Sequence, residues 1–263
     1  GLMLDALCRA AAAFERLDWL AAARKNGQFI MRHLWRDGRL QRVCKDGQTR
    51  LNGYLEDYAA VGNGLLTLYE VTGETTWFIQ ARQVLDRMIE RFEDEEGGGF
   101  FFTSHDHEAL LTRFKDPYDN ATPSGTSLAV TALLRLGALT GEAPLTERAM
   151  RVLRQMRAPM TEAPSAFGQL LCALDFALGD PCEIALVTVD PNDALPMRNE
   201  IFGKFIPNKV VAQRCAEDVE AARQVALLGG KTLVGHAPTA YVCRRFTCEA
   251  PVTTVEALRE ALG

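Results

Sequence analysis

The sequence lacks long apolar runs and an excess of basic residues. No stretch approaches the roughly 20 consecutive apolar residues of a membrane-spanning helix, and runs such as residues 170–174 end at a charge. Lys and Arg total 29 against 34 for Asp and Glu, which gives a formal net charge of −5. A nucleic-acid-binding protein would need a basic excess or stripe. We therefore expect neither a membrane nor a nucleic acid as a partner.

Cysteine and histidine are too scattered for a disulfide framework or a metal site. The 7 cysteines are odd in number and scattered along the chain, which favours a reducing compartment, and we expect a cytoplasmic protein. Of the 4 histidines, His105 and His107 flank Asp106 without a third ligand nearby. No glycine-rich nucleotide motif follows a predicted strand. We thus predict no metal, no cofactor and no Ser-His-Asp triad.

What the sequence does contain is a repeat of paired helices. Residues 75–92 carry apolar side chains at three- and four-residue steps and charges on the opposite face, as an amphipathic helix does. Residues 124–139 are apolar nearly all round, with Arg135 as the one charge, which is typical of a buried helix. Apolar segments (2–15, 54–71, 124–139, 165–178) alternate with amphipathic ones (18–34, 75–92, 145–157). A period of about 60 residues predicts a mainly α, double-layered toroid or solenoid of helical hairpins.

Strand patterns appear in the connections and near the C-terminus. Asp46-Gly47 predicts a β-hairpin within 35–52, and residues 100–103 and 109–112 predict a second one. After residue 178, strand candidates (183–189, 209–213, 239–243) alternate with helical patterns (217–227, 255–262). This predicts a helical part over residues 1–178 and a small α/β lobe over residues 179–263.

The topology predicts where a site would lie. Connections from an outer helix to the next inner helix lie at one end, so the inner helix N-termini, with their positive dipole ends, share one mouth. Asn52 as an N-cap would place Glu56 and Asp57 in a first turn there, as a candidate general acid or base with Tyr54 as a binding platform. The alternative is that these acids only stabilise the helix dipole.

The next two inner helices add further candidates. Thr122-Pro123 is a helix start that would direct Asp119 to the same mouth as a second carboxylate. The alternative is a capped loop with solvated charges. Candidate substrate-binding residues are Lys115, Tyr118, Ser124 and, from the fourth inner helix, Gln169. Cys243 and Cys248, spaced C-x4-C, are structural thiols or a labile, redox-active disulfide.

Five segments together resemble a known family. They are residues 53–59, 94–103, 118–125, 207–209 and 241–248. They resemble the thioredoxin-domain-containing proteins related to spermatogenesis-associated protein 20. The resemblance implies an N-terminal thioredoxin-like domain, a six-hairpin (α/α)6 toroid similar to glycosidases and N-acylglucosamine 2-epimerase, and a small C-terminal lobe. Thr126 stands where the family pattern favours Asn.

This chain would begin partway through such a toroid. It starts at Gly1 within a helical pattern that does not resemble a signal peptide, so we expect none in this segment, and it has about seven predicted helices instead of twelve. We expect a truncated chain, a cleavage product or a partner that covers the open face. Two functions stay open: a carbohydrate-active enzyme, hydrolase or epimerase-like, acting on a saccharide-like molecule, or a non-catalytic scaffold working with the thioredoxin-like domain.

Overall fold

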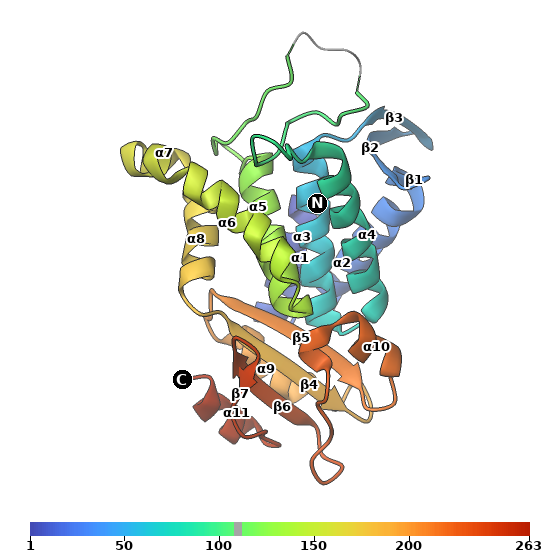
Figure 1. The fold of residues 1–263 in the computed structure, drawn as a ribbon. Coiled ribbons are helices and arrows are strands. Elements are labelled where there is room, and N and C mark those ends of the chain that lie inside the picture. Colours follow the sequence, from blue (N-terminus) through green and yellow to red (C-terminus); the bar gives the residue numbers. More distant parts are fainter. Residues whose placement is uncertain (108–111) are drawn as a thin grey trace.

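The computed structural model describes residues 1–107 and 112–263 and is mainly α-helical, as predicted. Three helical hairpins follow one another: α1 (Leu2–Ala13) with α2 (Leu17–Phe29), α3 (Leu55–Thr72) with α4 (Thr75–Phe92), and α5 (Gly125–Thr140) with α6 (Ala143–Gln155). A π-helical turn, Ile30–Leu34, extends α2, and the short α7 (Arg157–Glu162) leads through Pro164–Ala166 to α8 (Gly168–Leu178). In Figure 1, α1, α3, α5 and α8 run downwards in parallel, whereas α2, α4 and α6 return upwards.

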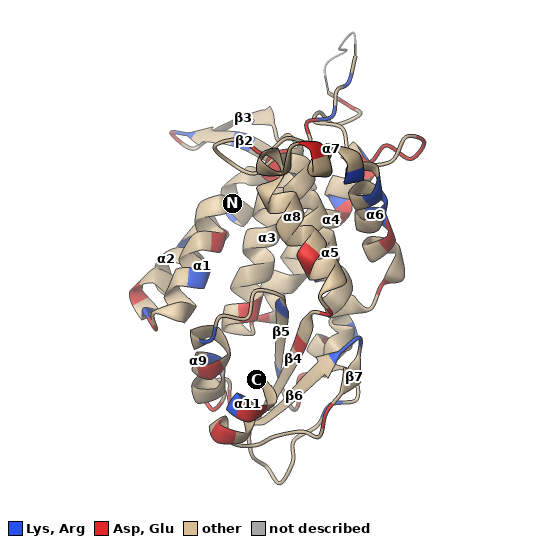
Figure 2. Ribbon diagram, turned by 90° about the vertical axis from the view of Figure 1, so that its left-hand side faces the viewer, with Lys and Arg blue, Asp and Glu red and all other residues tan. Residues whose placement is uncertain are grey.

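The two kinds of helix differ in burial as the sequence pattern predicts. Nearly every residue of α3 and α5 is buried, whereas α4 buries one face, which includes Trp77 and Leu85. In Figure 2 the ribbon of α3 is mostly the tan of uncharged residues, whereas that of α6 carries the colours of charged residues. Gly73 and Gly141 end α3 and α5 with φ of 71° and 69°, a conformation that favours glycine.

The inner helices form a row in the order α1, α3, α5, α8. The two inner helices at the ends of this row, α1 and α8, are only partly buried. α8 buries Leu170 and Ala173, and α1 buries Leu4, Cys8 and Ala11. The pattern predicts a fourth buried helix at 165–178, but α8 has one inner helix, α5, beside it and stays half open. A closed toroid thus remains a prediction.

The first predicted hairpin is confirmed and the second is wrong in its first arm. β1 (Trp35–Arg36), β2 (Arg39–Lys45) and β3 (Gln48–Asn52) form an antiparallel sheet that turns at residues 46–47. Residues 100–103 form no strand. Phe100 makes only an isolated antiparallel bridge with Glu93, in which the Phe101 N–H donates to Phe92 O at 2.8 Å at the end of α4. Of the second arm, residues 109–111 lie outside the described residues.

The C-terminal lobe is a four-stranded sheet with helices, as predicted. β4 (Cys182–Thr188) pairs in parallel with β5 (Lys209–Cys215) and antiparallel with β6 (Thr239–Arg244), and β7 (Thr247–Cys248) forms the edge next to β6. The helices are α9 (Leu195–Gly203), which the pattern missed, α10 (Val219–Gln224), followed by the turn Ala226–Leu228, and α11 (Val255–Ala261). One sheet face joins the core of the helical part, and the other packs on α9 and α11 (Figures 1 and 2).

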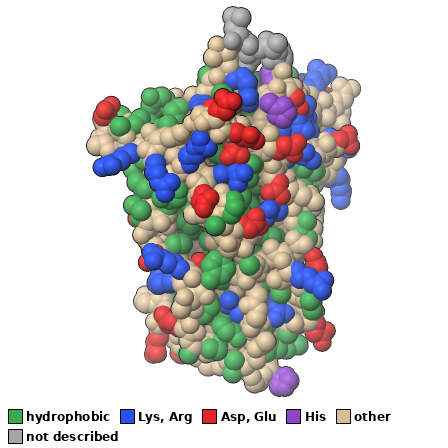
Figure 3. All heavy atoms as spheres, viewed as in Figure 1, with side chains coloured by type: hydrophobic (Ala, Val, Ile, Leu, Met, Phe, Trp, Pro, Cys, Tyr) green, Lys and Arg blue, Asp and Glu red, His purple; other side chains and the backbone are tan. Residues whose placement is uncertain are grey.

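This double coverage explains why β4 is buried along its whole length. The predicted boundary at residue 178 coincides with the last residue of α8, and the division into two domains stays a prediction. No described helix is both long enough and apolar enough to cross a membrane. On the face shown in Figure 3, basic and acidic side chains are interspersed.

Candidate functional site

The first turns of α3 and α5 lie side by side at one end of the helical row. A Cβ on Gly125 would lie 2.9 Å from Glu56 N, so glycine permits this close approach. A cavity of about 370 Å³ opens beside it, lined among others by Glu56, Asp57, Thr122 and Pro123. The structure thus brings these parts of the two predicted segments to one mouth.

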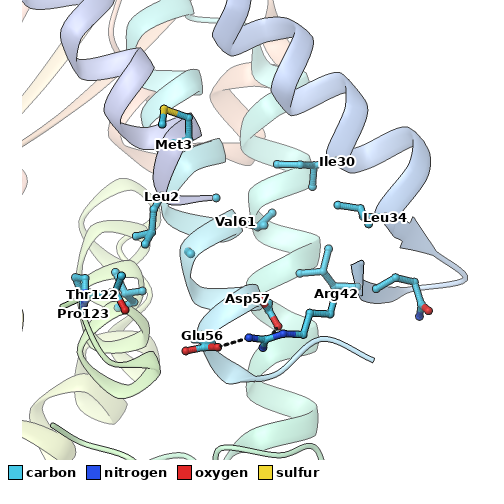
Figure 4. A pocket seen from close by; sticks show the side chains of 15 residues that line it. Leu2, Met3, Ile30, Leu34, Arg42, Glu56, Asp57, Val61, Thr122 and Pro123 are labelled. Carbon is cyan, nitrogen blue, oxygen red and sulfur yellow. Dashed lines mark hydrogen bonds and ion pairs between the residues drawn. The ribbon is translucent and has the colours of Figure 1, made fainter. Parts of the chain in front are cut away.

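Both predicted acids at the start of α3 bind the same guanidinium group (Figure 4). Arg42 on β2 donates to Glu56 Oε1 and to Asp57 Oδ2, each at 2.9 Å. Asp57 Oδ2 also accepts the Tyr54 N–H at 2.8 Å, so the helix N-cap is Tyr54 and the prediction of Asn52 was wrong. Asn52 instead ends β3, where the strand ladder continues to it.

Electrostatically, Asp57 is a partly buried acid held by two donors. Burial raises its pKa, while the Tyr54 N–H and the Arg42 charge oppose that rise. Two carboxylates in a first turn that share one guanidinium, one of which also accepts the N-cap N–H, stabilise a helix start. The acid–base role of Glu56 or Asp57 stays a prediction.

The Tyr54 ring is covered by other side chains of the protein. Its ring stacks on Phe102 with 4.8 Å between centroids, and the Arg42 guanidinium carbon lies 4.6 Å from the ring centroid. A sugar needs an exposed ring face to stack on an aromatic side chain. A ligand that stacks on Tyr54 would therefore have to displace Phe102 or Arg42.

Asp119 connects two inner helix starts. Its Oδ1 accepts the Ser124 N–H and its Oδ2 accepts the Gln169 N–H, both at 2.8 Å. Ser124 is the N-cap of α5, with Oγ accepting the Ser127 N–H at 3.0 Å. Because each carboxylate oxygen already has a backbone donor, Asp119 fixes the loop geometry whatever else it does.

Lys115 and Tyr118 lie on the same loop with other neighbours. Lys115 Nζ is 2.6 Å from Asp94 Oδ2 and also donates to Gly98 O, so it closes the glycine turn after α4. Tyr118 is exposed and its ring centroid lies 5.3 Å from that of Phe167. The substrate contacts predicted for both stay predictions.

A larger groove runs along the inner helices, and sequence reasoning missed it. Its volume is about 850 Å³, and its walls come from α1, α3, α5, α8 and residues 202–209. It shares Leu2, Ala60, Pro123 and Leu128 with the cavity at the mouth, so the two adjoin. Its lining is mainly apolar, with a row of polar side chains: Asn63, Thr67, Glu70, Thr131, Arg135 and Gln169. The predicted ligand-binding residue Gln169 therefore does line a groove.

Arg135 organises the floor of this groove. Its guanidinium donates to Asn63 Oδ1 at 3.1 Å, and to Thr67 Oγ1 and Glu70 Oε2 at 2.9 Å each. The Arg135 and Glu70 side chains are only 6% and 7% exposed. The second Glu70 oxygen, Oε1, is buried and has no hydrogen-bond partner among the described residues. A buried carboxylate oxygen without a donor is costly, so a donor from a ligand would be favourable here.

Asp5 and Arg9 extend this network onto α1. Asp5 accepts hydrogen bonds from Thr67 Oγ1 and, at 2.9 Å, from Arg9 Nε. Burial alone would raise the pKa of Asp5, but Arg9 and Arg135 outweigh it, and the pKa is lowered. Asp5 is therefore an ionised member of the network.

One sequence signal could have located the groove. Arg135 is the single charge in an otherwise apolar helix, and Asn63, Thr67 and Glu70 recur on one face of α3 at steps of four and three residues. A buried guanidinium needs hydrogen-bond partners, so such a charge points to a polar neighbour on the next inner helix.

Two further predictions concern cysteines and metals. Cys243 and Cys248 form a disulfide between β6 and β7, whereas Cys8, Cys44, Cys172, Cys182 and Cys215 are free. A redox role for the bonded pair stays a prediction. Within residues 1–107 and 112–263, no group of three or more His, Cys, Asp or Glu side chains could hold a metal ion.

Comparison with known proteins gives one consistent result. The chain matches no protein-family model. It is similar to spermatogenesis-associated protein 20. The human protein is 29% identical over 275 residues, covering 100% of this chain and 35% of the human protein, and the mouse protein is equally similar over 276 residues. An uncharacterised Caenorhabditis elegans protein is 26% identical over 273 residues, or 99% of this chain and 36% of that protein.

The chain thus spans about a third of the length of the curated relatives it matches. The similarity to spermatogenesis-associated protein 20 supports a relation to that family and by itself assigns no activity.

Proposed function

We propose that the groove binds a saccharide-like small molecule, and that the chain is part of a six-hairpin, glycosidase-like cytoplasmic protein of the spermatogenesis-associated protein 20 family. The observation that carries the proposal is the polar row on the floor of a mainly apolar groove of about 850 Å³. Sugars present both C–H faces and hydroxyl groups, and mainly apolar sites with a few placed polar groups suit such ligands. Glu70 lines the groove, and its buried Oε1 has no donor among the described residues, so a ligand hydroxyl that reached this oxygen would supply the missing hydrogen bond.

An enzymatic form of the proposal places chemistry at the mouth. Glu56 or Asp57 would transfer a proton in a hydrolase or epimerase-like reaction, and Arg42 would have to release that carboxylate first. Asp119 would act as the partner acid only if a ligand displaced one of its two backbone donors.

A specific observation favours the second candidate, a non-catalytic binding module. Each of the three predicted acids already holds a structural position, either in the Arg42 ion pairs or at the starts of α5 and α8. In that case the groove binds its ligand without turnover and works with the thioredoxin-like domain that the family resemblance implies.

A thermal-shift screen with neutral and anionic monosaccharides tests the binding proposal. A ligand at 100 times its Kd stabilises a protein by about 2.7 kcal/mol, which raises Tm by several degrees in a chain of this size. Thr131→Val removes a hydroxyl that lines the groove and should reduce the shift.

Thr140→Val is the matched control, because Thr140 lies on the same helix and makes the same bond to the carbonyl four residues earlier. No saccharide shift, or an equal shift in both variants, would remove the groove from the proposal. Turnover of an aryl glycoside that is lost in Asp57→Asn and Glu56→Gln separates the enzyme from the binding module.

A further inference from the structure

Lys209 lies in the groove without an acidic partner. It is the first residue of β5, it lines the groove, and its Nζ is 5.3 Å from the Phe202 ring centroid. Within the described part of the chain it forms no ion pair. The groove-lining acids are bound elsewhere: Asp5 to Arg9, Glu70 to Arg135 and Asp175 to Asn208.

Arg9 presents a second cation to the same groove. Its Nε donates to Asp5, while its terminal amino groups make no hydrogen bond within the described residues. The side chain is 60% exposed, so these donors are accessible to a ligand. A guanidinium with free terminal donors suits a planar or tetrahedral oxyanion.

Burial and two nearby charges of opposite sign, Glu70 and Arg9, act on the Lys209 ammonium group. Burial lowers its pKa, Glu70 opposes this and the positive charge of Arg9 adds to it. Because Arg9 and Lys209 line the same partly enclosed groove, an anion bound there would be attracted by both. The ionisable lining contains four basic residues (Arg9, Arg135, Lys204, Lys209) against three acidic ones (Asp5, Glu70, Asp175).

We infer that Arg9 and Lys209 form an anion subsite, and that the ligand of the groove is a sugar derivative carrying a phosphate or carboxylate group. The inference rests on the proposed saccharide function, whose ligand class it narrows. The anionic group lies at the α1 and β5 side of the groove, and the hydroxyl groups lie along the polar row from Glu70 to Gln169. The Phe176 and Phe202 side chains, which line the same groove, would cover its apolar faces.

Isothermal titration of the full chain with four probes tests this: glucose, glucose 6-phosphate, glucuronate and inorganic phosphate. We expect at least one of the two anionic sugars to bind at least about tenfold more tightly than glucose, because charge-assisted hydrogen bonds are the stronger ones. Lys209→Gln and Arg9→Gln should each reduce that affinity about tenfold. The anionic sugar that binds with the higher affinity shows whether the charged group of the ligand is a phosphate or a carboxylate.

Lys231→Gln is the matched control. Lys231 is also a largely buried lysine of the lobe, with its Nζ 5.7 Å from the Tyr241 ring centroid, and burial lowers its pKa as well. It should leave all four affinities unchanged. Melting curves of the variants show whether each is folded. If Lys209→Gln does not fold, Arg9→Gln still tests the inference, because Arg9 lies on the surface of its helix.

The outcomes separate this inference from the proposed function. Equal affinities for glucose and both anionic sugars would overturn the anion subsite and keep the saccharide proposal. Inorganic phosphate binding as tightly as glucose 6-phosphate would support the subsite and count against the saccharide. Anion affinity that survives in both Lys209→Gln and Arg9→Gln, or no binding of any probe, would overturn the inference.

Discussion

Removing Arg135 should destabilise the chain strongly, because it leaves a buried acid without its cation. The Arg135 and Glu70 side chains are 6% and 7% exposed, and the Arg135 guanidinium donates to the Glu70 carboxylate at 2.9 Å. Arg135→Met removes this charged donor. Breaking a buried pair in this way costs roughly 3–5 kcal/mol. At roughly 2–4 °C per kcal/mol for a chain of this size, Tm should fall by about 6–20 °C.

Urea unfolding followed by circular dichroism measures this loss, and a double variant identifies its cause. Glu70→Leu combined with Arg135→Met removes both charges, so the double variant should be more stable than Arg135→Met alone. Arg16→Met is the control, since the Arg16–Asp18 pair is exposed and its removal should cause no measurable loss. A loss below about 1 kcal/mol in Arg135→Met, or a double variant no more stable than it, would refute the reasoning.

Three further predictions concern single groups. Ser124→Ala removes the hydroxyl that accepts an N–H of the first turn of α5 at 3.0 Å and should cost about 1 kcal/mol in urea unfolding, whereas an unchanged midpoint would contradict this cap. Reduction of Cys243–Cys248, which have a sequence separation of 5, should cost about 2 kcal/mol, measured as the difference between unfolding curves with and without reductant. Burial raises the pKa of the Cys8 thiol to about 12, so at pH 8 iodoacetamide should modify the exposed Cys172 and spare Cys8, and early labelling of Cys8 in peptide mass spectra would show that α1 opens.

The helical repeat could be predicted because its cause is local. The buried face of α4 recurs at three- and four-residue steps, and the boundaries 75–92 agree with the structure. The aromatic run at 100–103 predicts a strand, but residues 101 and 102 lie in a loop and pack on neighbouring side chains. Phe102 stacks on Tyr54, and Arg113 lies with its guanidinium carbon 4.0 Å from the Phe101 ring centroid. Strand propensity alone does not distinguish these uses of an aromatic residue.

The candidate site could be predicted only in its location. The alternation of inner and outer helices is enough to bring Glu56 and Asp57 near residues 122–123. The partners of these acids depend on the path of β2, which brings Arg42 over the helix start, and no sequence spacing encodes that path. The role of Lys115 likewise follows from a contact between loops, and that of Asp119 from contacts with the starts of α5 and α8.

The floor of the groove, unlike the contacts at the mouth, could have been predicted from the sequence. A guanidinium in a helix that is apolar all round must find an acid on an adjacent inner helix, since an unpaired buried charge is too costly. On α3 the acids are Glu56 and Asp57 in the first turn and Glu70 near the other end, and Arg135 lies in the second half of the parallel helix α5. Of the three acids on α3, Glu70 is therefore the one at a position along the helix similar to that of Arg135 on α5. A lone charge on an inner helix therefore marks the place where the inner wall becomes polar, and in this chain that place lies within the groove of about 850 Å³.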